Sequence, residues 1–337
     1  MTILVTGGAG FMGSHWVKYV LANYPEYRVV NFDTLTYAGN LQNLKEVETH
    51  PNYTFVHGDI CDRNAVERVI EAYAINVIIN YAAETHVDRS IMDPNAFLRT
   101  DILGVYNLLE AVKKFHLDRF IQISTDEVYG SILDGAFTEA SPFHPNSPYA
   151  ASKAGGDHLC GAYAATYKTP VIVTHSCNFY GSHQYPEKMI PLFITNLLEG
   201  KKVPLYGDGN HIREFIHASD HCRAIDAVLH KAAPGSVYNI GTGVEMKNRD
   251  TVALMLDYLG LDANMIQPVP DRPGHDRRYA LDSSKIKADL GWEPLKDFQS
   301  GLHETIEWYR ENAWWWQPIK TGEYLTYYKK QYDTRSH

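Results

Sequence analysis

Residues 3–23 read ILVTGGAGFMGSHWVKYVLAN, and this stretch decides the fold. The β-branched run Ile3–Thr6 predicts a strand, and the helical period of Ser14–Asn23 predicts a helix. Between them stands the glycine-rich turn Gly7–Gly13. A strand, a tight turn and a helix in this order open a βαβ unit, in which a crossover helix connects parallel strands.

The same alternation continues through the first half of the chain. Further β-branched runs predict strands at Arg28–Phe32, Tyr53–His57, Val77–Asn80, Phe120–Ser124 and Val171–Thr174. Helix-length stretches separate them, among them Ala65–Tyr73, Val105–Phe115 and Tyr149–Tyr167. Repeated βα units bury both faces of a parallel sheet, so the sequence predicts an α/β protein with a doubly wound, Rossmann-type sheet.

The pattern loosens after about residue 180, where prolines separate shorter elements. We therefore expect a Rossmann domain over residues 1–179 and a smaller mixed α/β lobe, which binds the substrate, over residues 180–337. The position of this boundary is not sharply defined, because segments near residues 212–241 could belong to the first domain.

Composition argues against several classes of protein. The chain of 337 residues has a net charge of -9, spread without blocks of like charge, which argues against binding to nucleic acid or to an anionic membrane. No apolar run is long enough to span a bilayer and Met1 leads directly into the first strand, so we expect a cytoplasmic protein. The four cysteines have no ligand spacing, and His217 with His221 lacks a third ligand, so we expect no metal.

The glycine turn predicts a dinucleotide site, because it follows a strand and opens a helix. Its glycines let the backbone approach a pyrophosphate, and the helix N-terminus directs amides at the phosphates. Asp33 ends the second strand, 20 residues past Gly13, where a carboxylate accepts hydrogen bonds from the adenosine ribose. That carboxylate would repel a 2′-phosphate and no arginine follows it, so NAD is predicted rather than NADP.

The residues expected at the cofactor lie on this turn, at the carboxyl ends of the next strands and in a later helix. They are Gly7, Gly10, Phe11, Met12, Gly13, Asp33, Thr34, Leu35, Thr36, Asp59, Ile60, Tyr81, Ala82, Ala83, Tyr149 and Lys153. Taken alone, Asp59 is as typical of a helix cap as of an adenine contact.

Tyr149 and Lys153 are four residues apart in SPYAASKA, residues 147–154, where Pro148 suits the first turn of a helix. This spacing places both side chains on one helical face. An ammonium stabilises a nearby tyrosinate, so the pair has the chemistry of a base at neutral pH. A tyrosine and a lysine at this spacing also arise by chance. The presence of the glycine turn in the same chain is what favours a catalytic role for this pair.

Several stretches together resemble one known family. They include TGGAGFMGS (6–14), STDEVYG (124–130), SPYAASKA (147–154), YGDG (206–209), DRPGHDRRYALD (271–282) and LGWEP (290–294). These stretches resemble the dTDP-glucose 4,6-dehydratases, which belong to the extended short-chain dehydrogenases/reductases, from Thr2 to about Tyr309. STDEVYG is the most discriminating, since related epimerases have small or hydroxyl residues where Asp126 and Glu127 stand.

The resemblance implies an NAD-dependent hydro-lyase. Tyr149 would take the C4 hydroxyl proton while a hydride leaves C4, and the resulting ketone would acidify the hydrogen on C5. Glu127 would then remove that proton and Asp126, held protonated, would donate to the departing C6 hydroxyl. The hydride would return to C6. The alternative for Thr125, Asp126 and Glu127 is a strand end that caps the following turn.

The resemblance also implies contacts with the nucleotide sugar, with the cofactor and with a second subunit. The substrate residues are Thr85, Thr125, Asn178, Lys188, Met189, Pro204, Tyr206, Arg213, Asn248, Asp271, Arg272 and His275. Thr100 would be a further cofactor contact. Arg213 is the natural diphosphate partner, because a guanidinium matches phosphate oxygens, although by itself it would pass for a surface salt-bridge residue. The family further implies a homodimer built from helices that flank the sheet.

At one position the sequence departs from the family pattern, and this leaves the identity of the substrate undecided. Phe179 stands where the family usually has a second asparagine, which approaches the nicotinamide. A dehydratase acting on a related UDP-sugar, a nucleotide-sugar 4-epimerase or decarboxylase, and a non-catalytic NAD-binding regulator therefore remain alternatives. An epimerase or a decarboxylase would not need Asp126 and Glu127, and a regulator would not need the catalytic set.

Overall fold

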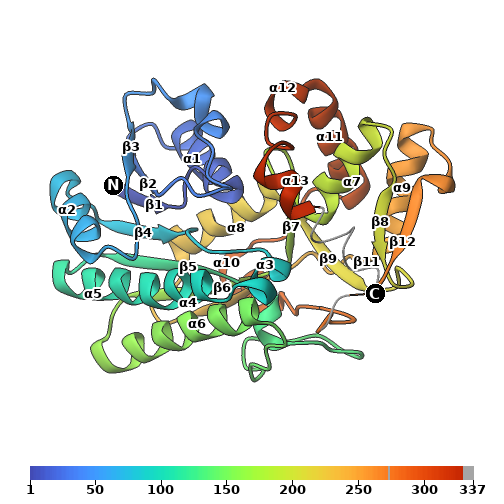
Figure 1. The fold of residues 1–337 in the computed structure, drawn as a ribbon. Coiled ribbons are helices and arrows are strands. Elements are labelled where there is room, and N and C mark those ends of the chain that lie inside the picture. The colour runs from blue at the N-terminus through green and yellow to red at the C-terminus, as the bar shows by residue number, and fades with distance from the viewer. Residues whose placement is uncertain (272–273, 329–337) are drawn as a thin grey trace.

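The computed structural model of the chain describes residues 1–271 and 274–328. Its central sheet has seven parallel strands in the order β10-β6-β5-β4-β1-β2-β3 (Figure 1). The strands are β1 Thr2–Thr6, β2 Arg28–Asp33, β3 Tyr53–His57, β4 Val77–Asn80, β5 Arg119–Thr125, β6 Val171–Ser176 and β10 Val237–Ile240. The predicted doubly wound, Rossmann-type sheet is confirmed.

Helices cover both faces of this sheet, because alternate residues of each strand point to opposite sides. Ile3 and Val5 of β1 pack in a core with Trp16, while Leu4 packs in a second core with Leu108. The first core contains side chains of α1 Phe11–Asn23, α8 Ala218–Lys231 and α10 Ser284–Leu290. The second contains side chains of α2 Arg63–Tyr73, α5 Val105–Phe115 and α6 Pro148–Tyr167.

Helix α6 illustrates how the local sequence sets an element. Ser147 is its N-cap, and the Ser147 hydroxyl accepts a hydrogen bond from the backbone N–H of Ala150 at 3.1 Å. Pro148 occupies the first helical position, where its missing N–H costs nothing. These two residues fix where Tyr149 and Lys153 enter the helix.

The elements between β4 and α5 form one nearly continuous helical path. They are α3 Val87–Met92, α4 Asn95–Leu98 and the π-helical turn η2 Arg99–Gly104. A π-turn bulges the backbone and often marks a functional site. Here it packs against α6, since a Cβ added at Gly156 would lie only 2.5 Å from the Asp101 carbonyl oxygen.

The second lobe has its own core. Its strands are β7 Asn178–Tyr180, β9 Ile212–His217 and β11 Glu245–Lys247 in one sheet, and β8 Val203–Tyr206 with β12 Ile266–Val269 in another. Its helices are α7 Met189–Leu198, α9 Asn248–Leu259, α11 Phe298–Glu311, α12 Ala313–Trp316 and α13 Glu323–Tyr328. Short 3-10 turns complete the chain at η1 Leu41–Val47, η3 Asp126–Tyr129 and η4 Ala263–Met265.

The two lobes exchange segments. Strand β10 pairs with β6 in the central sheet, and α8 packs in the core beside α1. A single cut at residue 179 would therefore separate hydrogen-bonded strands of one sheet, so the division of the chain into domains stays a prediction. The last helices also reach back, because the Trp315 indole donates to Asn43 at 2.8 Å and Asn43 donates to the Ala9 carbonyl oxygen at 2.9 Å.

All four cysteines are free thiols, and Cys160, Cys177 and Cys222 are buried. In residues 1–271 and 274–328, we find no helix of the length and apolar character needed to cross a membrane.

Candidate active site

A cavity of about 470 Å³ opens at the carboxyl ends of the central strands and extends to the second lobe. Ligands of open α/β sheets bind at this edge, where the strand order reverses around the first strand. Strands β1, β2, β4, β5 and β6 or the residues after them supply one wall, and α7, β8 and β9 supply the other.

The glycine turn forms a cradle that only glycine permits. Gly7 has φ +66°, and a Cβ there would lie 2.6 Å from the Ala82 nitrogen. A Cβ at Gly13 would lie 2.3 Å from the Gly7 carbonyl oxygen. The backbone is therefore packed as tightly as it can be beneath the N-terminus of α1, which leaves the exposed side of the turn for a pyrophosphate.

Asp33 holds this cradle in place from the end of β2. Its Oδ2 accepts from the Ala9 N–H at 2.9 Å and its Oδ1 accepts from the Leu35 N–H at 2.8 Å. Burial raises the pKa of this carboxyl, and the two N–H donors oppose that rise. Each carboxylate oxygen keeps a further lone pair, so the predicted ribose contact is compatible with both bonds.

The structure places most of the predicted cofactor residues on the cavity wall. Leu35 does not line the cavity, and its backbone serves Asp33 instead. The predicted residues on the wall are Gly7, Gly10, Phe11, Met12, Gly13, Asp33, Thr34, Thr36, Asp59, Ile60, Tyr81, Ala82, Ala83, Thr100, Tyr149 and Lys153.

Thr125, Asp126 and Glu127 lie where β5 turns into η3. The Thr125 hydroxyl accepts from the Glu127 N–H and donates to Asp126 Oδ1, both at 3.2 Å. Thr125 therefore does cap the turn, and it lines the cavity as well. Thr125 is thus the N-cap of η3, as the alternative interpretation of this strand end expects. Capping does not explain why Asp126 and Glu127 follow it.

Asp126 and Glu127 differ in exposure. Glu127 lines the cavity, whereas Asp126 is 1% exposed and lies behind the wall. Burial raises the pKa of Asp126 well above its ordinary value, and the charges of Glu127 and Glu214 raise it further. These effects favour the protonated form of Asp126, and its role as the acid stays a prediction. The sequence did not indicate that Thr125 would contact its carboxyl group.

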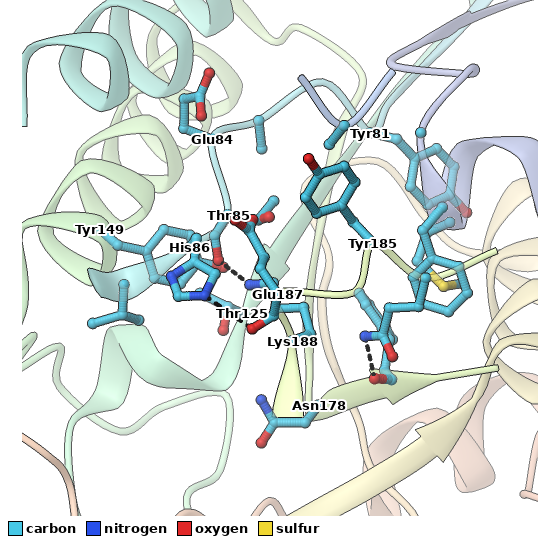
Figure 2. Close-up of a pocket in the computed structure, with 18 of the residues that line it drawn as sticks. Tyr81, Glu84, Thr85, His86, Thr125, Tyr149, Asn178, Tyr185, Glu187 and Lys188 are labelled. Atoms are coloured by element: carbon cyan, nitrogen blue, oxygen red, sulfur yellow. Dashed lines mark hydrogen bonds between the residues drawn. The ribbon is translucent and has the colours of Figure 1, made fainter. Parts of the chain in front are cut away.

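Tyr149 and Lys153 both line the cavity (Figure 2 shows Tyr149 beside Thr125). The Lys153 ammonium donates to the Ile123 carbonyl oxygen at 2.8 Å. Burial raises the pKa of Tyr149 well above its ordinary value, and Glu127 and Asp101 raise it further, while a hydrogen bond from Thr125 lowers it. Tyr149 and Lys153 are thus brought together at the cavity, and the lysine-stabilised tyrosinate stays a prediction.

The second lobe brings its predicted residues to the far wall of the cavity. Those that line it are Asn178, Lys188, Met189, Pro204, Tyr206, Arg213, Asn248 and His275, and Thr85, from the segment after β4 in the first lobe, lines the cavity as well. Asp271 does not line the cavity. Arg272 lies outside the described residues.

Arg213 is a buried cavity residue and not a surface one. It is 7% exposed, and its guanidinium donates to the carbonyl oxygens of Ile212 at 2.7 Å and Asp276 at 2.9 Å. The guanidinium also lies 4.4 Å from the centre of the Tyr279 ring. A buried cation at this wall attracts an anionic group of the ligand.

Among residues 1–271 and 274–328, His211, Asp271 and His275 form a cluster with metal-ligand chemistry, with their ligand atoms within 4.8 Å of one another. The two imidazole rings are stacked 3.7 Å apart at 13°. A metal lies in the plane of each imidazole that binds it, and two parallel rings do not converge on one ion. Asp271 instead bridges them, at 2.6 Å from His275 Nδ1 and 3.2 Å from His211 Nε2.

A loop before α7 supplies residues that the sequence did not single out. Glu187 accepts from the Tyr37 hydroxyl and from Arg89 Nε, both at 2.8 Å. Figure 2 shows the neighbouring contacts, in which His86 meets the Glu187 carbonyl oxygen at 3.3 Å and the Lys188 ammonium binds the carbonyl oxygen of Thr85. These bonds join the second lobe to the segment after β4.

Phe179 lines the cavity, so the departure from the family lies at the ligand. Its ring packs against His221 with centroids 4.5 Å apart, and its carbonyl oxygen accepts from Gln184 at 2.9 Å. His217 and His221 make no common metal site, because His217 bonds Ser219 and His221 packs on Phe179.

Several buried polar atoms of the cavity have no partner in the described part of the chain. They are the Ser176 hydroxyl, the Tyr81 hydroxyl and the side-chain carbonyl oxygens of Asn178 and Asn248. Buried polar atoms are rarely left without a hydrogen bond, so a polar ligand is expected to satisfy these. Together with the glycine cradle, they fit a dinucleotide and a second polar ligand in one cavity.

Comparisons with known proteins agree with this site. The family model described as GDP-mannose 4,6 dehydratase matches residues 4–305. A dTDP-glucose 4,6-dehydratase from Streptomyces niveus is 49% identical over 330 residues, which cover 97% of this chain and 98% of that protein.

Solved structures show the same likeness. A dTDP-glucose 4,6-dehydratase from Streptomyces venezuelae with NAD bound has a TM-score of 0.93 and 49% identity, over 95% of this chain and 100% of that one. A UDP-glucose 4-epimerase from Thermotoga maritima with UDP-glucose has a TM-score of 0.87 and 31% identity, over 93% and 100%.

The cradle predicts that Gly13→Ala abolishes tight dinucleotide binding, because the new Cβ meets backbone atoms of Gly7 and Gly8 that cannot turn aside. We expect the Kd for NAD, measured by calorimetry, to rise at least about tenfold, a change of about 1.4 kcal/mol. Gly161→Ala is the matched control, since no atom lies within 4 Å of its Cβ. Unchanged binding by Gly13→Ala would show that the turn does not contact the cofactor.

Proposed function

The chain belongs to the nucleotide-sugar 4,6-dehydratases and is an NAD-dependent hydro-lyase, and we propose that Tyr149, Glu127 and Asp126 divide its proton transfers among them. The proposed reaction converts dTDP-glucose into dTDP-4-keto-6-deoxyglucose. The observation that carries the proposal is the position of Glu127 beside Tyr149 on one cavity wall, with the protonated Asp126 behind them.

The residues around the glycine turn hold the cofactor. NAD held there would supply the hydride acceptor for C4 of the sugar and the hydride donor for C6. Tyr149 takes the C4 hydroxyl proton during the oxidation, and Thr125, which lines the same cavity, hydrogen-bonds the sugar near C4. Lys153, held by the Ile123 carbonyl oxygen, keeps a positive charge beside the reacting oxygen.

The elimination needs one base and one acid. The C4 ketone acidifies the C5 hydrogen, and Glu127 on the cavity wall removes it. Asp126 supplies the proton with which the C6 hydroxyl leaves as water, by way of the Thr125 hydroxyl that contacts its carboxyl group. Burial serves this role, since a group whose pKa is raised so far stays protonated until it is used.

The second lobe recognises the nucleotide diphosphate. Arg213 and Lys188 supply positive charge, while Asn178 and Asn248 present buried carbonyl oxygens without a partner in the described residues. The dTDP-glucose dehydratases among the relatives support thymidine as the base. A UDP-sugar remains the alternative, and a 4-epimerase is disfavoured because it has no use for the acid pair.

We further propose that the enzyme works as a homodimer in the cytoplasm, with residues 1–179, α8 and β10 forming the cofactor domain. Helices α5 and α6 lie side by side at the outer face of the sheet (Figure 1). Exposed apolar side chains gather on them and on the adjoining turn, with Leu103 43%, Tyr106 36% and Tyr167 53% exposed. Burial of such a patch against a second copy would stabilise a dimer.

Glu127→Gln is expected to separate oxidation from elimination. The variant keeps Tyr149 and Lys153, so C4 oxidation survives, but without its base the elimination falls by roughly 10²–10⁴. Reduced cofactor should accumulate, visible as near-ultraviolet absorbance after substrate is mixed in. Wild-type turnover in heavy water should place one deuterium at C5. Normal product from the variant, or no deuterium at C5, would remove Glu127 from the mechanism.

Arg213→Ala is expected to weaken substrate binding more than chemistry, because the diphosphate does not react. A charged hydrogen bond contributes about 1.5–3 kcal/mol, so KM should rise on the order of 10- to 100-fold while kcat changes little. Arg277→Ala is the control, since Arg277 pairs with Asp208 at 3.0 Å on the surface. A collapse of kcat with KM unchanged would place Arg213 in the chemistry instead.

The dimer is tested by Tyr106→Glu, which introduces a charge into the proposed interface. We expect light scattering to show a dimer for the wild type and a monomer for the variant at micromolar concentration. Leu133→Glu is the control, because Leu133 is 73% exposed and lies outside these helices. A wild-type monomer, or a Tyr106→Glu dimer as stable as the wild type, would refute this interface.

A further inference from the structure

One segment of the second lobe is bonded to the first lobe on both sides of the glycine turn. It comprises residues 185–188, which directly precede α7, and we call it the strap. Tyr185, Glu187 and Lys188 of the strap line the cavity. Lys188 is assigned above to the substrate, whereas Glu187 has no part in the proposed reaction.

Tyr37 joins the strap to the loop that follows β2. Its hydroxyl donates to Glu187 Oε1 at 2.8 Å, and its ring meets the Tyr185 ring edge-on with centroids 5.2 Å apart. Tyr37 follows Asp33 by four residues and lines the cavity as well. One side of the strap is therefore attached to the loop that is expected to hold the adenosine ribose.

Arg89, His86 and Thr85 join the strap to the segment after β4. Arg89 Nε donates to Glu187 Oε2 at 2.8 Å. His86 Nε2 donates to the Glu187 carbonyl oxygen at 3.3 Å, and the Lys188 ammonium donates to the Thr85 carbonyl oxygen (Figure 2). Each of these three bonds connects the second lobe with the first.

The order of the sheet places the glycine turn between these two attachments. Strand β1 lies between β4 and β2, and the turn at residues 7–13 follows β1. Arg89 and Tyr37 come from opposite sides of that turn, yet the Arg89 guanidinium lies 3.8 Å from the centre of the Tyr37 ring. Glu187 bonds both of them. The loop after β2, helix α3 and the strap therefore meet beside the cavity that the turn lines.

The Glu187 carboxylate is suited to a closure that opens again. Its side chain is 1% exposed, so in the closed state it depends on Tyr37 and Arg89 for its hydrogen bonds. Opening would let water replace these partners, which offsets most of the bonds that are lost. Behind the strap, the Tyr324 hydroxyl of α13 donates to the Pro186 carbonyl oxygen at 3.0 Å. This bond lies within the second lobe and survives when the strap leaves the first.

We propose that the strap is the gate through which the dinucleotide enters and leaves the cavity, and that Glu187 is the residue that holds the gate closed. The inference goes beyond the proposed function and does not depend on which sugar reacts. A closed strap keeps the cofactor in place through successive turnovers. The reaction permits this, because the hydride taken from the sugar is given back to it.

A gate changes the rates of cofactor exchange and leaves the affinity as it is. Weaker bonds between the strap and the first lobe raise the population of the open state, so association and dissociation of NAD become faster by the same factor. Loss of a direct contact with the cofactor speeds dissociation alone and raises the Kd equally. The two rates together therefore distinguish a gate from a binding residue.

Tyr37→Phe and Glu187→Gln test the gate. The first removes only the hydroxyl, and the second keeps the shape of the side chain but removes the charge that Arg89 pairs with. We expect labelled NAD to leave each holoenzyme at least about tenfold faster when unlabelled NAD is added in excess, because bonds to a charged group are lost. Stopped-flow binding of NAD to cofactor-depleted protein should accelerate by the same factor, with the Kd within about threefold of the wild-type value.

Tyr24→Phe is the matched control. The Tyr24 hydroxyl also donates to a carboxylate, Asp226 Oδ1 at 2.7 Å, and both residues lie outside the cavity wall, so both rates should stay at their wild-type values. Wild-type rates in Tyr37→Phe would overturn the gate, and this variant decides alone if Glu187→Gln does not fold. Faster release with an equal rise in Kd would also overturn it, as would faster exchange in the control. The measurements use no sugar nucleotide, so their outcome is independent of the proposed reaction.

Discussion

The close contact between the glycine turn and the end of β4 is the constraint on which the rest of the structure depends. Gly7 and Gly13 admit no side chain, so the N-terminus of α1 is held against the sheet at the edge where the cavity opens. Asp33 fixes the turn through the Ala9 N–H, and Trp315 reaches the same turn through Asn43 and the Ala9 carbonyl oxygen. Residues of both lobes thus bond to the glycine turn, which holds the two lobes in a fixed position on either side of the cavity.

Burial of acidic groups is the second organising feature. Asp126, Asp101 and Glu84 lie at or behind the cavity wall, and burial is the largest cause of the raised pKa of each. An exposed carboxyl is ionised at neutral pH, so such groups act as acids only where water is excluded. The sheet keeps water away from these groups, because helices cover both of its faces and ligands reach only the carboxyl ends of its strands.

Elements with a clear hydrophobic period were predictable from the sequence, and contacts between distant segments were not. The six predicted strands agree with the structure to within two residues at each end, because buried parallel strands leave an unbroken β-branched run. Leu35 does not line the cavity, and its positive φ and the bond of its N–H to Asp33 were not apparent from the sequence. The hydrogen bond from Ser152 to Asp101 was not predictable either, because η2 and α6 meet only in the folded chain. The raised pKa of Tyr149 also depends on burial and on carboxyls from separate elements.

The dehydratase and epimerase relatives share this fold with the chain, so the fold alone does not select the reaction. Oxidation at C4 requires only a base and a dinucleotide, which Tyr149 and the glycine turn provide. Elimination across C5 and C6 adds an acid and a second base, and these have to lie within reach of the same sugar. The turn after β5 places the proposed base, Glu127, on the cavity wall and the proposed acid, Asp126, behind it, and the Thr125 hydroxyl contacts the Asp126 carboxyl and the Glu127 backbone N–H. In the proposed mechanism, that difference in depth favours different protonation states for two adjacent carboxyls, which is what loss of water requires beyond the shared scaffold.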